Sequence, residues 1–406
     1  MNEPMLSVED ALMQILDAFD PLESERVPIL ESLGRVLAED VYADVDIPPH
    51  DNSSMDGYAV RAADTAGASR KSPSRLIVIG GTPAGYVPEK EVAPGTTICI
   101  MTGAPIPPGA DAVVKVEDTE AEGEWVRVLA EAEPGQHVRP AGEDVRQGEL
   151  VLSRGTRIRP QEVGMLAALG QKRVPVAHRP RVAILASGDE VVEIDTPLEP
   201  GKIRNSNSYS NAAQVVKYGG EPILLGIAPD RVEKLTEKVH AGLAQDVDLL
   251  LTSGGVSVGD FDLVKKVLAA EGEINFWRVR MKPGKPLAFG RIGETPVLGL
   301  PGNPVSVMVS FEMFIRPALL KMQGMTNWER PTVEAVLMEA IEHKDERRHY
   351  VRVRVEQREG KYCARLTGGQ GSGILSSMVK ANGLAIIPED WDHAPASARV
   401  QVILLD

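Results

Sequence analysis

The order of apolar and polar positions divides the chain into stretches with different periods. Near the start, apolar residues recur three and four positions apart, which predicts an amphipathic helix that begins at Ser7. Asp10 lies three residues after Ser7, the spacing of a capping box. From Val41 to about Gly155 short apolar runs alternate with Pro and Gly turns, which is typical of β-structure. These runs cover residues 76–79, 97–101, 112–116 and 125–130. A short helix is expected over residues 161–169, ending at Gly170.

Between Arg181 and Met322 predicted strands alternate with predicted helices. The expected strands are residues 182–186, 222–227, 247–252, 274–279, 287–290 and 297–300. The expected helices are residues 208–218, 231–243, 263–270 and 305–321, the second with a capping box from Asp230 and Glu233. This alternation predicts a parallel, doubly wound α/β sheet, in which ligands bind at the carboxyl ends of the strands.

Short β runs return after Arg330 and predict a small, barrel-like β domain at the end of the chain. They cover residues 333–338, 350–357, 384–387 and 400–405. The whole pattern predicts a multidomain α/β plus β protein, for which the chain length allows two to four domains. Their expected bounds are 1–45 together with 140–178 (a helix-containing linker or dimer domain), 46–139 (β-rich), 179–328 (α/β) and 329–406 (C-terminal β).

Composition narrows the classes of partner and compartment. The chain has 406 residues, 25% of them charged, and a net charge of -14, which argues against nucleic acid and anionic membranes as main partners. No run approaches the 18 apolar residues of a membrane span, and residues 1–20 lack the basic region of a signal peptide. Two distant cysteines imply no disulfide framework, and the histidines show no zinc-site spacing. We therefore expect a cytoplasmic protein.

A glycine-rich segment, residues 252–262 (TSGGVSVGDFD), holds the strongest chemical signal. It follows an apolar run and precedes a helical pattern, so it is predicted to be a strand-to-helix turn. Glycines at such a turn allow backbone N–H groups to approach a phosphate, so Ser253, Gly254, Gly255 and Ser257 are predicted to contact one. Asp262 and its neighbour Asp260 suggest a metal cation beside that anion.

Polar residues also follow the other predicted strands. The segments are residues 187–190 (SGDE), Asp230, residues 282–286 (KPGKP) and residues 300–304 (LPGNP). Because parallel strands end at one edge of a sheet, we expect five carboxylates there beside Arg278, Lys282 and Lys285. Carboxylates suit Mg²⁺ shared with substrate phosphates, and the basic side chains suit oxyanions.

Other interpretations of these segments stay open. Each one alone is equally well explained as a turn filled with turn residues. Residues 255–259 also match G-x-S-x-G, the nucleophile elbow of α/β-hydrolases, but the strand ends too far ahead of Ser257 and the first later histidine is His343. Outside the α/β region, Asp56, Thr102 and Asp144 lie in polar turns that also have a purely structural explanation.

Seven motifs in order resemble those of MoeA-type molybdopterin molybdotransferases, the group that includes the gephyrin E-domain. They are residues 52–61 (NSSMDGYAVR), 101–105 (MTGAP), 142–144 (GED), 187–190, 253–259, 282–286 and 300–306 (LPGNPVS). The resemblance covers essentially the whole chain. It implies an α/β domain of the molybdopterin-binding type. It also implies that molybdate is inserted into adenylyl-molybdopterin with divalent-cation assistance, releasing AMP and molybdenum cofactor.

The resemblance also implies roles for individual residues in a homodimeric enzyme whose site lies between the α/β domain of one subunit and the region of Asp56 in the other. Catalytic roles fall on Asp56, Thr102, Asp144, Glu190, Asp230, Asp262 and Lys282, of which Glu190, Asp230 and Asp262 are assigned to the metal or to water activation. Substrate or anion binding is expected of Ser253, Gly254, Gly255, Ser257, Arg278, Lys285, Pro301, Asn303, Pro304, Arg352 and Ser372. Arg278 stands where some members of the family have lysine, which keeps the charge but changes the donor geometry.

Two other functions remain as alternatives. A molybdopterin adenylyltransferase would share the α/β domain and its glycine-rich loop, but it would not require the flanking β regions. A scaffold role would use the C-terminal domain for partners, as the gephyrin relative does with receptor peptides. A transient contact with a separate adenylyltransferase is also expected from the resemblance.

Overall fold

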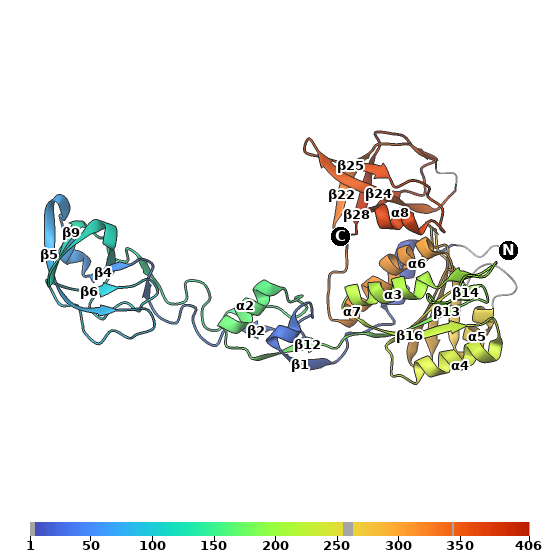
Figure 1. The fold of residues 1–406 in the computed structure, drawn as a ribbon, viewed down its shortest axis with the longest axis horizontal. Coiled ribbons are helices and arrows are strands. Elements are labelled where there is room, and N and C mark those ends of the chain that lie inside the picture. Colours follow the sequence, from blue (N-terminus) through green and yellow to red (C-terminus); the bar gives the residue numbers. More distant parts are fainter. Residues whose placement is uncertain (1–4, 255–262, 343–344, 406) are drawn as a thin grey trace.

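The computed structural model describes residues 5–254, 263–342 and 345–405. The molecule is elongated (Figure 1). A β-rich unit lies at one end, a small unit with α2 (Pro160–Ala168) lies in the middle, and an α/β unit with an adjacent β-barrel lies at the other end. No described helix is long and apolar enough to cross a membrane.

Helix α1 (Val8–Leu16) begins at Ser7, as predicted. The Ser7 Oγ accepts the Asp10 N–H at 2.9 Å, and its hydroxyl donates to Asp10 Oδ2 at 2.6 Å. The carboxylate therefore binds the hydroxyl instead of the Ser7 backbone N–H of a full capping box. The apolar face of α1 packs into the core of the α/β unit, against α7 (Arg316–Met322).

The middle unit is built from distant segments of the chain. Strand β1 (Ser24–Pro28) pairs with β12 (Arg173–Ala177), and β2 (Val41–Tyr42) pairs with β11 (Leu150–Leu152). A short 3₁₀ turn, η1 (Ile29–Ser32), and α2 pack with these strands around one apolar cluster. Two chain segments leave this unit together and lead to the β-rich unit (Figure 1).

The β-rich unit holds a six-stranded sheet in the order β7-β4-β6-β5-β9-β8. Its strands are β4 (Gly57–Val60), β5 (Ser69–Thr82), β6 (Thr96–Ile100), β7 (Ala112–Lys115), β8 (Thr119–Glu122) and β9 (Trp125–Ala130). The 3₁₀ turns η2 (Ala62–Thr65) and η3 (Val116–Asp118) interrupt it, and β3 (Asn52–Ser53) pairs with β10 (Val138–Arg139) at its base. All four β runs expected here are strands.

The α/β unit has a six-stranded sheet in the order β16-β13-β17-β21-β20-β18. Its strands are β13 (Arg181–Ser187), β16 (Glu221–Ala228), β17 (Leu249–Ser253), β18 (Glu273–Arg278), β20 (Pro286–Ile292) and β21 (Thr295–Leu300). Helices α3 (Ser206–Lys217), α4 (Val232–Leu243), α5 (Leu263–Glu271) and α6 (Pro304–Ser310) flank it, and the short strands β14 (Val191–Val192) and β15 (Ile203–Arg204) pair near the end of β13.

Strands β16, β13, β17 and β21 pair in parallel, and β20 runs antiparallel to both its neighbours, so β18 has the same direction as the other four. Only Gly293 and Glu294 separate β20 from β21, with Gly293 at a φ of 58°. Because a two-residue loop joins only antiparallel strands, these two form a hairpin inside the sheet. The sheet is therefore mixed, while β18 still ends at the same edge as β21.

Two helix predictions need correction. Helix α4 begins after Arg231, and no side chain caps it, so the predicted capping box of Asp230 and Glu233 is wrong. Asp230 instead turns back to Asp189, whose carboxylate accepts its N–H. The helix predicted over residues 305–321 is α6, then a π-helical turn η4 (Phe311–Ile315), then α7.

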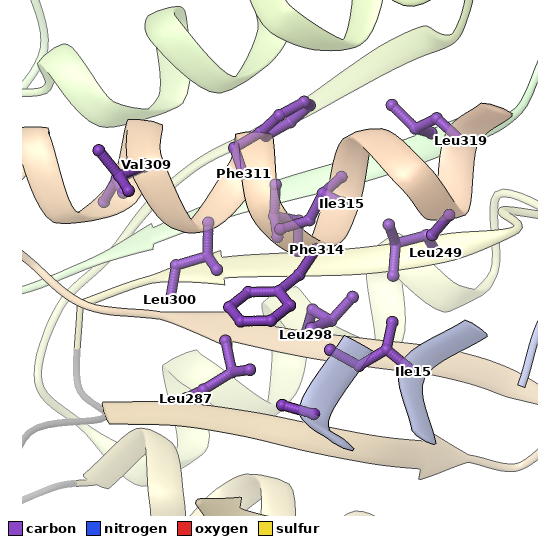
Figure 2. Packing of buried hydrophobic residues seen from close by; sticks show 14 of the residues in the cluster. Ile15, Leu249, Leu287, Leu298, Leu300, Val309, Phe311, Phe314, Ile315 and Leu319 are labelled. Atoms are coloured by element: carbon purple, nitrogen blue, oxygen red, sulfur yellow. The ribbon is translucent and has the colours of Figure 1, made fainter. Parts of the chain in front are cut away.

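The core of the α/β unit lies between the sheet and the α6–η4–α7 segment (Figure 2). Leu249, Leu298 and Leu300 project from the strands toward Phe314 and Ile315. The buried residues of this cluster come from α1, the sheet and α6–α7 together. This packing fixes the strands whose carboxyl ends carry the polar loops.

The C-terminal unit is a closed barrel of five strands, which confirms the predicted barrel-like domain and adds β25 to the four expected runs. They are β22 (Thr332–Leu337), β24 (Arg348–Arg358), β25 (Lys361–Leu366), β26 (Gly383–Ile387) and β28 (Arg399–Leu404). Strand β24 pairs with both β25 and β26, which closes the ring. Helix α8 (Leu375–Lys380) and the pair β23 (Ile341–Glu342) and β27 (His393–Ala394) cover it, and β19 (Met281–Lys282) joins β24 to the α/β unit.

Candidate active site

The carboxyl ends of the central strands border a cavity of about 320 Å³. Ser253 at the end of β17 lies beside Ala186 on β13 and Leu300 on β21. The cavity is lined by residues of β13, the turn after it, the start of α3, the end of β17 and the turn before α6. They include the predicted site residues Glu190, Ser253, Gly254, Asn303 and Pro304. The structure therefore brings these five together at one edge of the sheet, while Pro301 is buried between Leu300 and the lining residue Gly302.

Two glycines are required by the backbone at this edge. Gly188 has a φ of 133°, and a Cβ there would lie 2.6 Å from Glu190 Oε2. Gly254 has a φ of 94°, and a Cβ there would lie 2.8 Å from the carbonyl oxygen of Ser187. Both φ angles are ones that L side chains rarely adopt. Because these two residues are glycines, the two turns can approach one another, and backbone atoms form this part of the cavity wall.

Carboxylates at the same edge fit the predicted metal site in part. Glu190 lines the cavity and is exposed, and no basic side chain in the described chain pairs with it. Asp189 Oδ1 accepts the Asp230 N–H at 3.0 Å, and Asp230 Oδ2 accepts the Asp189 N–H at 3.4 Å, which joins the two turns. Within the described residues no three potential ligands form a group. Gly255, Ser257, Asp260 and Asp262 lie outside the described residues. The carboxylate oxygens present suit Mg²⁺, which commonly takes one or two protein carboxylates plus waters and phosphate.

The predicted basic residues lie apart from the cavity wall. Lys282 is on β19, where its Nζ lies 3.3 Å from Asp345 Oδ2. Hydrogen bonds from Arg347 and His349 hold the pKa of the Asp345 carboxyl well below its usual range, so it stays anionic. Arg278 ends β18, and the Lys285 carbonyl accepts the Val279 N–H in the same hairpin. Lys282 thus lies where β19 joins the α/β unit to the barrel, and none of these three basic residues lines the cavity.

Arg352 on β24 is a buried cation, 2% exposed. Its Nε donates to Ser377 Oγ at 3.2 Å and its Nη2 donates to the Gly371 carbonyl at 3.1 Å, and no carboxylate pairs with it in the described chain. Burial lowers the pKa of Arg352 to about 10, so the guanidinium remains protonated at neutral pH. The loop it holds includes Ser372, whose carbonyl accepts the Val305 N–H of α6. This contact places Gly373 in the cavity wall.

Asp56 and Thr102 lie in the β-rich unit, where the structure brings them into direct contact. Asp144 lies in an exposed turn between that unit and the middle unit, and its N–H donates to the Ile47 carbonyl. Figure 1 shows that the β-rich unit and the α/β unit are at opposite ends of the molecule. Within one chain these three residues are therefore not part of the cavity at the sheet edge.

Comparison with known protein families matches three successive regions of the chain. Residues 6–170 match the family description "MoeA N-terminal region (domain I and II)", residues 183–321 match "Probable molybdopterin binding domain", and residues 334–405 match "MoeA C-terminal region (domain IV)". The chain belongs to the MoeA family. The fold and family expected from the sequence motifs are thus confirmed.

Members of the MoeA family resemble the chain over its full length. It is 38% identical over 404 residues to a Mycobacterium tuberculosis protein named molybdopterin molybdenumtransferase 2, covering 98% of this chain and 99% of that one. It is 37% identical to the Bacillus subtilis molybdopterin molybdenumtransferase, covering 98% and 94%. The crystal structure of the MoeA protein of Pyrococcus horikoshii has a TM-score of 0.86 and 37% identity, covering 99% of this chain and all of that one.

For this MoeA-family chain, sequence reasoning missed one segment of the cavity wall. Asn205, Ser206 and Asn207, at the start of α3, line the cavity opposite the turn before α6. Asn205 caps α3 by accepting the Ser208 N–H at 3.1 Å. Asn207 donates through Nδ2 to the Gly302 carbonyl at 2.8 Å. The available signal was two asparagines flanking a serine just ahead of a predicted helix.

Proposed function

We propose that this protein is a molybdopterin molybdotransferase, which inserts molybdate into adenylyl-molybdopterin and releases AMP and molybdenum cofactor. The observation that carries the proposal is the full-length match, at 34–38% identity, to bacterial proteins named molybdopterin molybdenumtransferase. A polar cavity at the carboxyl edge of the sheet, within the matched molybdopterin-binding region, supports it.

In this proposal the turns around Ser253 and Gly254 bind the terminal phosphate of molybdopterin. Backbone N–H groups at the glycine-rich turn are suited to an anion because no Cβ keeps the ligand away. Gly255 and Ser257 would extend the same turn. Pro301, Asn303 and Pro304 would hold the opposite wall rigid, since Pro304 fixes the first residue of α6.

Glu190, Asp230 and Asp262 are proposed to hold a divalent cation, Mg²⁺ or a similar ion. Such an ion, when bound, supplies a Lewis acid for the bridging phosphate. The carboxylates of this chain would orient the phosphoanhydride and the attacking water through that charge. A cation held by these carboxylates would offset their negative charge, which explains how an acidic protein accepts two anionic substrates.

Lys282, Lys285, Arg278 and Arg352 are proposed to bind molybdate and phosphate charge. Arg352 fits this role because it is a protonated cation, buried, without a carboxylate partner in the described chain, next to a loop that reaches the cavity. Lys282 is already paired with Asp345, so an oxyanion would share that lysine or displace the carboxylate. Ser372 would assist from the same loop as Gly371.

We further propose that two copies assemble into a homodimer in which Asp56, Thr102 and Asp144 of one subunit complete the cavity of the other. The support is that these exposed residues lie far from the sheet edge of their own chain (Figure 1). Sedimentation equilibrium should give twice the chain mass at micromolar concentration. Mixing Asp56→Ala with Glu190→Ala subunits should restore activity to about a quarter of wild type, because random exchange leaves one intact composite site per hybrid dimer. A mixture as inactive as its parents would contradict a shared site.

The domain bounds expected from the sequence, the cytoplasmic location and a transient contact with an adenylyltransferase stay proposals. Limited proteolysis tests the bounds, with cleavage expected near residues 46, 140, 179 and 329. Pull-down with purified adenylyltransferase tests the contact.

The decisive assay supplies adenylyl-molybdopterin, Mg²⁺ and molybdate to the purified protein. AMP release that depends on molybdate is the expected result, and omission of Mg²⁺ should abolish it. Formation of adenylyl-molybdopterin from ATP and molybdopterin would favour the adenylyltransferase instead. Glu190→Gln should reduce turnover at least a hundredfold, while Glu193→Gln, at a nearby half-buried position that does not line the cavity, serves as the matched control.

A further inference from the structure

Three basic side chains from two segments of the chain converge on one carboxylate, that of Asp345. The Arg347 guanidinium donates to both of its oxygens, through Nε to Oδ1 at 2.9 Å and through Nη2 to Oδ2 at 2.8 Å. His349 Nε2 lies 3.2 Å from Oδ1, and Lys282 Nζ lies 3.3 Å from Oδ2. Lys282 on β19 pairs with His349 on β24 in the strand ladder, which holds the two side chains near one another.

The chemistry of this group is that of an oxyanion site. The low pKa of Asp345 keeps its carboxylate ionised, and an ionised carboxylate only accepts hydrogen bonds, so His349 Nε2 must carry the shared proton. An arginine fork and a lysine ammonium are donors that proteins use to bind phosphate, and the imidazole N–H adds a third. The charges of Lys282 and Arg347 together exceed that of one carboxylate, so a tetrahedral dianion would balance them more closely.

The Asp345 carboxylate can leave Lys282 without disturbing the strands. Asp345 lies in the bend that precedes β24, outside the strand ladder. Its contact with Lys282 is the longest of the four contacts to this carboxylate, and the Lys282 side chain is 47% exposed. A ligand can therefore reach Lys282 and replace the carboxylate while β19 and β24 remain paired.

We propose that Lys282, Arg347 and His349 form an oxyanion subsite that the Asp345 carboxylate occupies until a tetrahedral oxyanion displaces it. An internal competitor lowers the apparent affinity for the ligand by the fraction of time it holds the donors, so Asp345 sets that affinity. The inference rests on the proposed function for the identity of the oxyanion, which is molybdate or the phosphate of the adenylate. It adds Arg347 and His349 to the residues expected to bind an anion.

Asp345→Asn tests the competition, because the amide keeps the size of the side chain and removes its charge. Calorimetric titration of the full-length protein with molybdate alone and with AMP alone separates the two sources of the oxyanion. The variant should bind at least one of them about tenfold more tightly than wild type does, because no carboxylate holds the donors. The oxyanion that gains affinity is the one assigned to the subsite. Arg347→Gln should weaken binding of that same oxyanion about tenfold.

Glu389→Gln is the matched control, because Glu389 pairs with Arg348 at the same end of the barrel and its side chain is 25% exposed, against 30% for Asp345. It should bind both oxyanions as wild type does. If Asp345 only ties the barrel to the α/β unit, Asp345→Asn will lose stability and tighten neither oxyanion. Unchanged or weaker binding of both oxyanions by Asp345→Asn would thus overturn the proposal.

Lysine acetylation, followed by mass spectrometry, tests the subsite in the wild-type protein should Asp345→Asn fail to fold. Molybdate or AMP should protect Lys282 over the same concentrations at which it binds, and should leave the exposed Lys234, which pairs with Glu237, unprotected. Equal labelling of Lys282 with and without both oxyanions would refute the subsite. Neither measurement requires turnover, so protein that passes these tests and releases no AMP would contradict the proposed function alone.

Discussion

Asp56 Oδ1 accepts two hydrogen bonds from Thr102, one from the backbone N–H at 2.7 Å and one from the hydroxyl at 2.8 Å. Strands β4 and β6 hold them together, since Gly57 pairs with Ile100. These bonds favour the charged form and lower the pKa of Asp56 below its ordinary value. Thr102 thus stabilises the anionic form of Asp56. Because Asp56 is exposed, burial contributes little to its pKa.

Replacing Thr102 by valine should raise the pKa of Asp56, because the hydroxyl bond is lost while the backbone bond remains. Because the pKa of this carboxyl is lower in the folded than in the unfolded state, the carboxylate stabilises the native state at pH values above the unfolded-state pKa. That stabilisation is lost as the pH falls through the folded-state pKa. The acid limb of the pH–activity profile should therefore move to higher pH in the variant. Carbon-detected NMR titration of the Asp56 carboxyl measures the shift directly.

Thr119→Val is the control for that titration, because the Thr119 hydroxyl donates to the Val116 carbonyl in the same unit. It should leave the Asp56 titration unchanged. A Thr102→Val protein whose Asp56 titrates as in wild type would contradict the role assigned to Thr102.

Ser377 should be needed to orient Arg352. Its Oγ accepts the Arg352 Nε–H and donates to the Ile374 carbonyl at 2.7 Å, and Ser377 is 1% exposed. Ser377→Ala leaves a buried N–H of a cation unpaired, which should lower the free energy of unfolding by about 1–3 kcal/mol. It should also raise the molybdate KM several-fold with a smaller change in kcat, because the cation remains but is less well oriented.

The adjacent Ser376→Ala is the matched control for Ser377, since Ser376 is exposed on the same helix. Its stability should stay within about 0.5 kcal/mol of wild type. Ser377→Thr keeps the hydroxyl and should recover much of the molybdate affinity. Equal molybdate KM values in the Ala and Thr variants would show that the hydroxyl does not position Arg352.

Glu312 should join the barrel to the α/β unit. It lies in the π-helical turn η4, 9% exposed, and accepts hydrogen bonds from Tyr218, Gln214 and Arg330. Arg330 in turn donates to the Leu404 and Leu405 carbonyls at the end of the barrel. Burial and then the Glu312 charge raise the pKa of Tyr218 well above its usual value, so its hydroxyl stays a donor.

Glu312→Gln should destabilise the protein by about 3–5 kcal/mol, because it leaves the nearly buried Arg330 without its counter-ion. Chemical unfolding measures the loss. The matched pair Glu334 and Arg399 is surface-exposed, so Glu334→Gln should cost less than about 1 kcal/mol. Equal losses for the two variants would mean that Glu312 contributes no more than a surface ion pair.

Local patterns predicted most elements, because apolar periodicity and turn residues are local properties. The antiparallel pairing of β20 and β21 was overlooked although its signal is local. The two strands are separated only by Gly293 and Glu294, which is too short for the crossover that a parallel pair requires. The burial of Arg352 does not follow from the pattern of its own strand, because α8, a separate segment of the chain, covers that face of β24. Asn207 was missed because its partner, the Gly302 carbonyl, is distant in sequence.

Gly254 should tolerate no side chain. Its φ of 94° and a Cβ position 2.8 Å from the Ser187 carbonyl oxygen mean that alanine must move backbone at the junction of β13 and β17. Strain of this kind costs of order 1–3 kcal/mol, and we expect Gly254→Ala to lose both stability and molybdopterin binding. Gly164, inside α2 with no atom within 4 Å of a Cβ, is the matched control, because alanine there should stabilise the protein by about 0.5–1 kcal/mol. Thermal unfolding and pterin fluorescence of both variants provide the test, and a Gly254→Ala protein that binds molybdopterin as wild type would remove this turn from the phosphate site.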